Sequence, residues 1–377
     1  MVPSGAFVPL RIGIFAPYDL ARAGGVTNQI RSQARALRRL GHAVRVFGPA
    51  SAPLEEGSVA LCGSVSLTIS GTASCLGLDP RSAGRVARLF REEPFDIVHV
   101  HEPLTPLVPW VAVRLARAPV VGTFHVHREG GHIFYPRARP LLAPLMRRLA
   151  HRIAVSEAAR RTVADHFPGD YEIIPNGIEV DEFSARRPRP DAFEPGRLHV
   201  LYVGRLEPRK GVDHLVHAMS AVQRQLPHAR LVVVGDGPER ERLRGLASAC
   251  GIDVIFAGRV DDAKLPAYFQ WSDVVASPAL GGESFGIVLL EAMACGTPIV
   301  ASRIEGYVGL AGAADCGPLV PPGDADAIAG ALVPLLENEA YRRLVGACGA
   351  VAARQYDWSA LASRLVVIYD RLHRQQR

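Results

Sequence analysis

The sequence predicts an α/β protein that has two doubly wound parallel sheets in separate domains. The chain has 377 residues and is 48% hydrophobic, which is too long for one core and suits two domains of ordinary size. Short apolar runs alternate with helical patterns in both halves, and strands that are apolar on both faces are typical of parallel sheets with helices on two sides. A segment rich in Pro and Arg, residues 184–196, is interpreted as the linker between the halves.

The first domain is expected over residues 1–188. It begins with the strand Arg11–Ala16, followed by Val26–Leu40, in which apolar residues recur at helical intervals. Its further strands are short and apolar: Ala43–Phe47, Ile97–Val100, Val120–Phe124 and Ile153–Val155.

The second domain is expected over residues 189–357. Its strands are predicted at His199–Val203, Leu231–Val234, Val254–Phe256, Val274–Ala276 and Pro298–Ala301. The connecting helices are predicted at about 212–226, 238–250, 284–295 and 325–337. The last segment, residues 358–377, is helical with no strand after it. It could cap the second domain or cross back to the first.

Composition limits where the protein acts. No run approaches the roughly 20 apolar residues of a spanning helix, and the N-terminus lacks the charged start and apolar middle of a signal peptide. We therefore expect a cytoplasmic protein. The six cysteines have no metal-type spacing, so free thiols are favoured over a disulfide framework.

Positive charge is concentrated in the first half. Residues 1–196 hold 24 Lys and Arg against 18 Asp and Glu, whereas the remainder holds 19 of each. One face of a helix predicted over residues 81–91 carries Arg81, Arg85, Arg88 and Arg91, and a second basic stripe contains Arg31, Arg35 and Arg38. Such a basic amphipathic helix can lie on anionic lipid, and we expect peripheral association with the inner face of the membrane. The alternative is a solvated face whose apolar side packs on the sheet. Nucleic acid is not favoured, because the basic residues lack interleaved aromatics.

Four loops that follow predicted strands carry polar chemistry. They are APYDLARAGGV, GTFHVH, GRLEPRKG and GGESFG, and ligands of open α/β sheets bind at such loops. Gly24 and Gly25 precede a helix, which suits phosphate, although a tight turn explains them equally well. The chain lacks both G-x-G-x-x-G and GK[ST], which argues against a nicotinamide fingerprint and an ordinary ATPase.

The two loops of the second domain pair cations with carboxylates. Arg205 and Lys210 suit a diphosphate, although two basic residues in a loop are more often simply solvated. Glu283 is expected at a glycine-rich bend and Glu291 about two turns inside the following helix, near the edge of its apolar stripe. A carboxylate in that position needs hydrogen-bond donors, which the hydroxyls of a sugar supply. A metal site at His99, His101, His125, His127 and His132 is a competing hypothesis, but a sugar pocket explains the same residues.

Several motifs in joint order resemble the retaining glycosyltransferases of family 4. They are GGV at 24–26, PNG at 175–177, G-R-x-x-x-x-K at 204–210, VVVGDGPE at 232–239 and Glu-x7-Glu at 283–291. The resemblance implies the GT-B fold, in which two Rossmann-like domains border an interdomain cleft and the C-terminal helix returns to the N-terminal domain. It also implies catalysis without a metal or other cofactor.

The resemblance also implies roles for single residues. Arg205 and Lys210 would hold the diphosphate of a nucleotide-sugar donor, Glu291 the ribose and Glu283 the transferred sugar, with His125 near the reacting centre. The backbone N–H groups expected to assist in binding the diphosphate are those of Gly25, Phe285, Gly286 and Ile287. The loop expected beside the nucleotide base contains Val260 and Asp262. Tyr18 and Thr27 are expected on the acceptor side together with the arginines of residues 81–88.

Within the family, YDLARAGGV, HEPLTP, GTFH and RIAVS resemble the bacterial phosphatidylinositol mannosyltransferases, which use GDP-mannose. Leu104 and Leu280 depart from their usual pattern, so a UDP-glucose-type enzyme acting on another lipid or a small soluble acceptor is kept as an alternative. The family favours front-face attack over a double displacement through a carboxylate. A non-catalytic nucleotide-sugar-binding protein is disfavoured because His125 and Glu283 are both present. A pyridoxal-dependent phosphorylase is a further rival, although the chain has just two lysines, Lys210 and Lys264.

Overall fold

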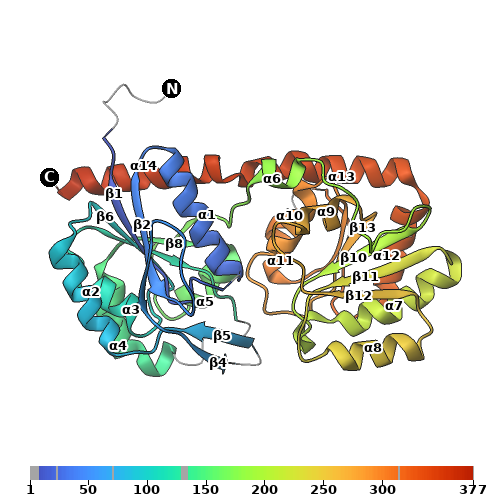
Figure 1. Ribbon diagram of the computed structural model, residues 1–377, viewed down its shortest axis with the longest axis horizontal. Helices are drawn as coiled ribbons and strands as arrows, with labels where there is room; N and C mark the ends of the chain where they lie inside the picture. The colour runs from blue at the N-terminus through green and yellow to red at the C-terminus, as the bar shows by residue number, and fades with distance from the viewer. Residues whose placement is uncertain (1–7, 23, 70–71, 129–134, 313–314, 377) are drawn as a thin grey trace. The chain divides into compact units, whose positions relative to one another are not determined.

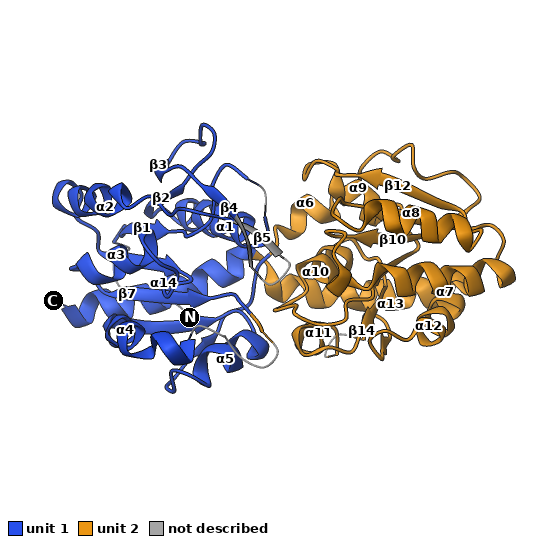
Figure 2. Ribbon diagram, turned by 90° about the horizontal axis from the view of Figure 1, so that it is seen from below, with its two compact units in different colours: residues 1–126, 130–177, 358–377 blue, residues 127–129, 178–357 orange. Residues whose placement is uncertain are grey.

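The computed structural model describes residues 8–22, 24–69, 72–128, 135–312 and 315–376. They form two compact units, each built around a parallel sheet (Figure 1, Figure 2). Unit 1 comprises residues 1–126, 130–177 and 358–377, and unit 2 comprises residues 127–129 and 178–357. The prediction of an α/β fold with two parallel sheets is confirmed.

The sheet of unit 1 has the order β3-β2-β1-β6-β7-β8-β9 with parallel pairing throughout. Its strands are β1 (Arg11–Phe15), β2 (Ala43–Pro49), β3 (Ser58–Cys62), β6 (Ile97–His101), β7 (Val120–Phe124), β8 (Leu149–Ala154) and β9 (Glu172–Ile173). An antiparallel hairpin of β4 (Val65–Ile69) and β5 (Thr72–Leu76) forms a separate sheet. The helices are α1 (Gly25–Arg39), α2 (Arg81–Glu92), α3 (Val108–Leu115), α4 (Tyr135–Arg148), α5 (Glu157–Ala164) and α14 (Trp358–Gln376).

Both faces of this sheet are covered. Ile12 and Ile14 of β1 belong to a buried core with α1 and α14, whereas Phe15 belongs to a second core with α2, α3 and α4. Because successive strand side chains point to opposite faces, one strand contributes to both cores. The short apolar runs in the sequence reflect this burial on two sides.

Unit 2 repeats this plan. Its parallel sheet has the order β12-β11-β10-β13-β14-β15. The strands are β10 (Leu198–Val203), β11 (Ala229–Val234), β12 (Val254–Gly258), β13 (Val274–Ser277), β14 (Ile299–Ser302) and β15 (Leu319–Val320). The helices are α6 (Val180–Ser184), η1 (Pro208–Lys210), α7 (Val212–Gln225), α8 (Arg240–Ala249), α9 (Leu265–Gln270), α10 (Ile287–Ala294), α11 (Glu305–Ala311), α12 (Ala325–Glu337), α13 (Glu339–Ala353) and η2 (Arg354–Tyr356).

Two segments near the unit boundaries are placed by their apolar side chains. Trp358, Leu365 and Tyr369 of α14 are buried in the core that contains α1, so the C-terminal helix is part of unit 1. The chain passes into unit 2 at residue 178, whereas the sequence analysis expected the change near residue 188. Ile178 and Phe193 are buried in a core with α10, which makes the intervening segment part of unit 2. The cysteines are free thiols.

Candidate active site

Two polar loops of unit 2 lie at the carboxyl ends of neighbouring strands. One follows β10 and carries Arg205 and Lys210, and the other follows β13 and carries Glu283. Because β10 and β13 are hydrogen-bonded neighbours, the loops meet at the edge where such sheets bind ligands. The N–H of Leu280 donates to the carbonyl of Arg209 at 2.8 Å and ties the loops together.

Five side chains in these loops form an alternating row of charges, which we call the charge network: Arg205, Glu207, Arg209, Glu283 and Lys210. Glu207 lies between two cations, with its Oε1 2.9 Å from Nη2 of Arg205 and its Oε2 3.1 Å from Nε of Arg209. Glu283 Oε1 contacts Nη1 of Arg209 and lies 2.8 Å from Nζ of Lys210. Sequence reasoning missed Glu207 and Arg209, since single charged residues in a turn give no periodic signal.

Glu283 is charged although it is largely buried, with 15% of its side chain exposed. Burial by itself would raise the pKa of this carboxyl, but the charges of Lys210 and Arg209 outweigh it and hold the pKa below its ordinary value. An ionised carboxylate accepts hydrogen bonds and donates none. Glu283 can therefore fix the orientation of a ligand that offers hydroxyl groups.

The GDGPE motif supports the loop after β10. Leu206 N–H donates to the carbonyl of Asp236 at 3.0 Å, and Gly204 N–H donates to the carbonyl of Val234 at 3.0 Å. Gly235 has φ 132°, and a Cβ there would lie 1.9 Å from the carbonyl oxygen of Gly204. A glycine is needed for this close approach, and the motif holds in place the loop that carries Arg205.

Helix α10 begins at Ile287, later than the predicted start at residue 284. Gly286 precedes it with φ 85°, and a Cβ at this position would lie 2.8 Å from the Tyr307 ring. This left-handed turn delays the helix, so Phe285 is buried in the segment before α10 begins. The first turn of an α-helix has N–H groups without intrahelical partners, which keeps Phe285, Gly286 and Ile287 as candidates for binding an anion.

Glu291 lies about one turn inside α10, where the sequence analysis expected two. Its side chain is half-buried, and burial, helped by the carboxylate of Asp262, raises its pKa to about 8. Among the described residues, no hydrogen bond to this carboxylate is found. Asp262 is exposed, and Val260 packs against the core that contains α10. Glu291 is therefore a carboxylate with capacity for external hydrogen-bond donors.

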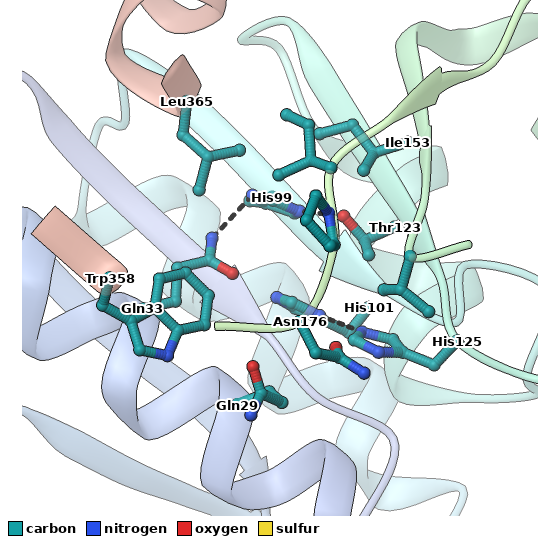
Figure 3. A pocket seen from close by; sticks show the side chains of 13 residues that line it. Gln29, Gln33, His99, His101, Thr123, His125, Ile153, Asn176, Trp358 and Leu365 are labelled. Carbon is teal, nitrogen blue, oxygen red and sulfur yellow. Dashed lines mark hydrogen bonds between the residues drawn. The ribbon is translucent and has the colours of Figure 1, made fainter. Parts of the chain in front are cut away.

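In unit 1, His125 lies beside a cavity of about 20 Å³ at the carboxyl ends of β6 and β7 (Figure 3). Its Nε2 lies 2.8 Å from Nδ1 of His101, and Figure 3 shows Asn176 beside this pair. Burial lowers the pKa of His125 to about 4, against the opposing effect of Asn176. His125 is a neutral imidazole at physiological pH, with one N–H and one lone pair.

The backbone next to His125 is held by Glu102, a buried residue with φ 48°. The Glu102 carboxyl accepts hydrogen bonds from the N–H groups of His125 and Val126. Burial raises the pKa of Glu102 to about 7, and these N–H donors act in the opposite direction. Non-glycine residues with positive φ persist where the surroundings fix them, which makes Glu102 a support for the position of His125.

Of the histidines in the competing metal hypothesis, His99, His101 and His125 stack side by side, with ring centroids 4.7 and 5.1 Å apart. His127 belongs to unit 2, whereas His99, His101 and His125 belong to unit 1, and His132 lies outside the described residues. His99 is bound instead by the hydroxyls of Tyr369 and Thr123. The described part of the chain contains no group of three or more His, Cys, Asp or Glu residues that could hold a metal ion.

The loop before α1 presents a second helix start. Gly24 is the N-cap and Gly25 the first residue of α1, both exposed, with no acidic residue in the first turn. Thr27 is buried, with its hydroxyl 3.5 Å from the carbonyl of Asp19, and Tyr18 forms a β-bridge with Leu76. Thr27 therefore supports the loop from inside the unit, and Tyr18 is half-buried.

Helix α2 keeps its arginines outside and its apolar side inside. Val86 and Leu89 are buried in a core of unit 1, whereas Arg81, Arg85 and Arg88 are exposed. Arg85 donates to the carbonyl of Leu61, and Arg88 pairs with Glu92. In the second basic stripe, Arg38 donates to the carbonyls of Val44 and Gly57. None of the described helices is long and apolar enough to cross a bilayer.

Comparison with known proteins decides the family. The model for glycosyltransferase family 4 matches residues 23–182, and that for glycosyl transferases group 1 matches residues 186–349. The chain is 38% identical to a phosphatidyl-myo-inositol mannosyltransferase of Mycobacterium leprae, over 96% of each protein. The chain belongs to glycosyltransferase family 4. This glycosyltransferase is also 29% identical to a GDP-mannose-dependent alpha-(1-6)-phosphatidylinositol monomannoside mannosyltransferase of Mycolicibacterium smegmatis, over 91% of this chain and 94% of that protein.

Solved structures agree on the fold of this glycosyltransferase. Sucrose-phosphate synthase from Thermosynechococcus elongatus matches with a TM-score of 0.76 and 25% identity over 96% of this chain and 99% of that one. The fold is therefore GT-B, as the resemblance implied.

Proposed function

We propose that this glycosyltransferase moves mannose from GDP-mannose to a hydroxyl of phosphatidylinositol with retention of configuration. The observation that carries the proposal is the 38% identity, over 96% of both chains, to a protein named phosphatidyl-myo-inositol mannosyltransferase. A relative that is named GDP-mannose-dependent supports the choice of donor.

The donor diphosphate is assigned to Arg205 and Lys210. Breaking a glycosyl-phosphate bond builds negative charge on the leaving diphosphate, and preorganised cations and helix N–H groups lower that barrier. The N–H groups of Phe285, Gly286 and Ile287 and of Gly25 supply the same kind of stabilisation. These groups do what a divalent cation does in other transferases, and we propose that no metal or other cofactor is required.

The ribose and the mannose of the donor are assigned to carboxylates, because sugar hydroxyls donate hydrogen bonds and carboxylates accept them. Glu291 accepts from the ribose hydroxyls, with Val260 and Asp262 on the side of the base. Glu283 accepts from hydroxyls of the mannose. A Glu283 that is already paired with Lys210 is a positioning group rather than a nucleophile. We therefore favour front-face attack, in which the leaving phosphate takes the proton of the acceptor and no covalent intermediate forms.

His125 is assigned to the transferred mannose. Its imidazole is neutral, since burial lowers its pKa to about 4. Its Nε2 is bound to His101, so Nδ1 is the nitrogen that can donate or accept one hydrogen bond without placing a positive charge beside the reacting carbon. His125 therefore positions the sugar and presents a neutral polar group to the reacting centre.

The acceptor side includes a membrane surface at the inner leaflet. Because the apolar side of α2 is buried, the contact with lipid is electrostatic, through Arg81 and Arg88 rather than through insertion. Flotation with phosphatidylinositol vesicles and with neutral vesicles tests this. We expect binding to the anionic vesicles, and its loss in the double variant Arg81→Glu, Arg88→Glu but not in Arg114→Glu, which changes charge on α3. Equal binding to both vesicle types contradicts the proposal.

Transfer from a panel of donors tests the reaction. GDP-mannose, UDP-glucose, UDP-GlcNAc and ADP-glucose are incubated with phosphatidylinositol vesicles, with Glu291→Ala as control. We expect a mannolipid from GDP-mannose and loss of donor binding in the variant. Transfer from UDP-glucose alone would favour the alternative of a glucosyltransferase. Binding that survives in Glu291→Ala would contradict the role of that residue.

A further inference from the structure

Arg209 occupies the centre of the charge network. Among the described residues it contacts both buried carboxylates, through Nε to Glu207 and Nη1 to Glu283. Nη1 also lies 3.3 Å from the carbonyl of Gly282, which gives the guanidinium a third anchor. Arg205 and Lys210 stand at the two ends of the row, each beside one of the carboxylates.

Both carboxylates of the charge network are buried and need positive charge beside them. Glu207 and Glu283 expose 2% and 15% of their side chains, so each needs a cationic partner. If Arg205 and Lys210 turn toward an anionic ligand, both carboxylates lose one partner at the same time. Arg209 remains in contact with both, so neither is left buried and unpaired.

We propose that Arg209 is a positioning residue that neutralises Glu207 and Glu283 and thereby leaves Arg205 and Lys210 available to the diphosphate of the donor. The inference rests on the proposed function and adds to it a residue that touches neither phosphate nor sugar. Three cations against two carboxylates give the empty network a net charge of +1. Without Arg209 the two end cations balance the two carboxylates, and the excess that attracts a diphosphate disappears.

The test compares GDP with GMP, because the two differ by one phosphate. Both are titrated into the wild-type protein, Arg209→Gln, and the control Arg244→Gln, whose arginine pairs with Glu241 on α8 outside the network. Removing one charge at about 8 Å, at an effective dielectric constant of about 20, predicts that Arg209→Gln weakens GDP binding about tenfold or more. GMP binding should change less, and the control should match the wild-type protein.

The double variant Glu207→Gln, Arg209→Gln separates this role from a merely structural one. It removes one charge of each sign and restores the net +1, so its affinity for GDP should recover to within about threefold of wild type. If the role of Arg209 were merely structural, the losses of GDP affinity caused by the two substitutions would add. The double variant also carries the test if Arg209→Gln alone does not fold.

The outcomes distinguish the inference from the proposed function. If Arg209→Gln binds GDP as tightly as the wild-type protein does, with the same ratio of GDP to GMP affinity, the inference is overturned. The proposed function is then unaffected. A double variant whose GDP affinity does not recover to within about threefold of wild type also overturns the inference. A wild-type protein that binds neither GDP nor GMP overturns both.

Discussion

Lowering the pH from 8 to 6 is expected to weaken the binding of GDP, because it protonates Glu291. Burial and the nearby Asp262 carboxylate raise the pKa of this residue to about 8. The proposed contact with ribose hydroxyls needs the ionised form, which is lost as the pH falls through that value. With a pKa of about 8, roughly one molecule in ten is ionised at pH 7 and roughly one in a hundred at pH 6. Affinity should therefore fall about tenfold from pH 7 to pH 6.

Calorimetric titration of GDP across this range measures the effect. Repeating the titration at pH 7 in buffers with different heats of ionisation should show release of close to one proton, since binding ionises Glu291. Glu291→Gln is the matched control, because it keeps the shape of the side chain and removes the titration. The variant should keep just the shallow dependence due to the terminal phosphate, whose pKa is about 6. The same slope in wild type and variant would show that Glu291 is not the group whose titration controls GDP binding.

Three further predictions concern stability and the helix start. Gly286→Ala places a Cβ 2.8 Å from the Tyr307 ring at φ 85°, so denaturant unfolding should show a loss of about 1–3 kcal/mol, and a variant with unchanged stability would contradict the packing. Tyr369→Phe removes a hydrogen bond to His99 and should cost about 1–3 kcal/mol in urea while GDP affinity stays the same. Glu291→Gln should melt at a higher temperature than wild type at pH 8. Folding raises the pKa of Glu291 from 4.5 to about 8, so the wild-type protein loses stability as the pH rises from 4.5 to 8, whereas the variant has no carboxyl to ionise. Equal melting temperatures at pH 8 would contradict that pKa.

The fold was accessible from sequence because both sheets are buried on two sides. Runs such as Val274–Ala276 and Leu231–Val234 are apolar throughout, and no half-exposed strand would produce that pattern. The boundary near residue 178 was not accessible, because the linker composition of residues 184–196 says nothing about the packing of Phe193 into unit 2. The sequence left open whether the apolar side of α2 packs on the sheet or lies on lipid, because the amphipathic pattern is the same in both cases. The structure shows that this side is buried in a core of unit 1.

The candidate site was accessible in part. Motif spacing pointed to Arg205, Lys210, Glu283 and Glu291, and the structure brings Lys210 into contact with Glu283. The part played by Arg209 depends on two strands that are adjacent in the sheet but far apart in sequence, which no local pattern records. The start of α10 was misplaced because the glycine at 286 adopts φ 85°, whereas the surrounding residues favour a helix.

In the proposed reaction, mannose passes from GDP-mannose to phosphatidylinositol with its anomeric configuration retained. Incubation of the protein with GDP-mannose and phosphatidylinositol vesicles, in the presence of a chelator of divalent metals, followed by mass spectrometry and NMR of the extracted lipid, tests it directly. We expect one added hexose per lipid, linked in the α configuration of the donor. A β-linked product, or no mannolipid, would contradict the proposed reaction.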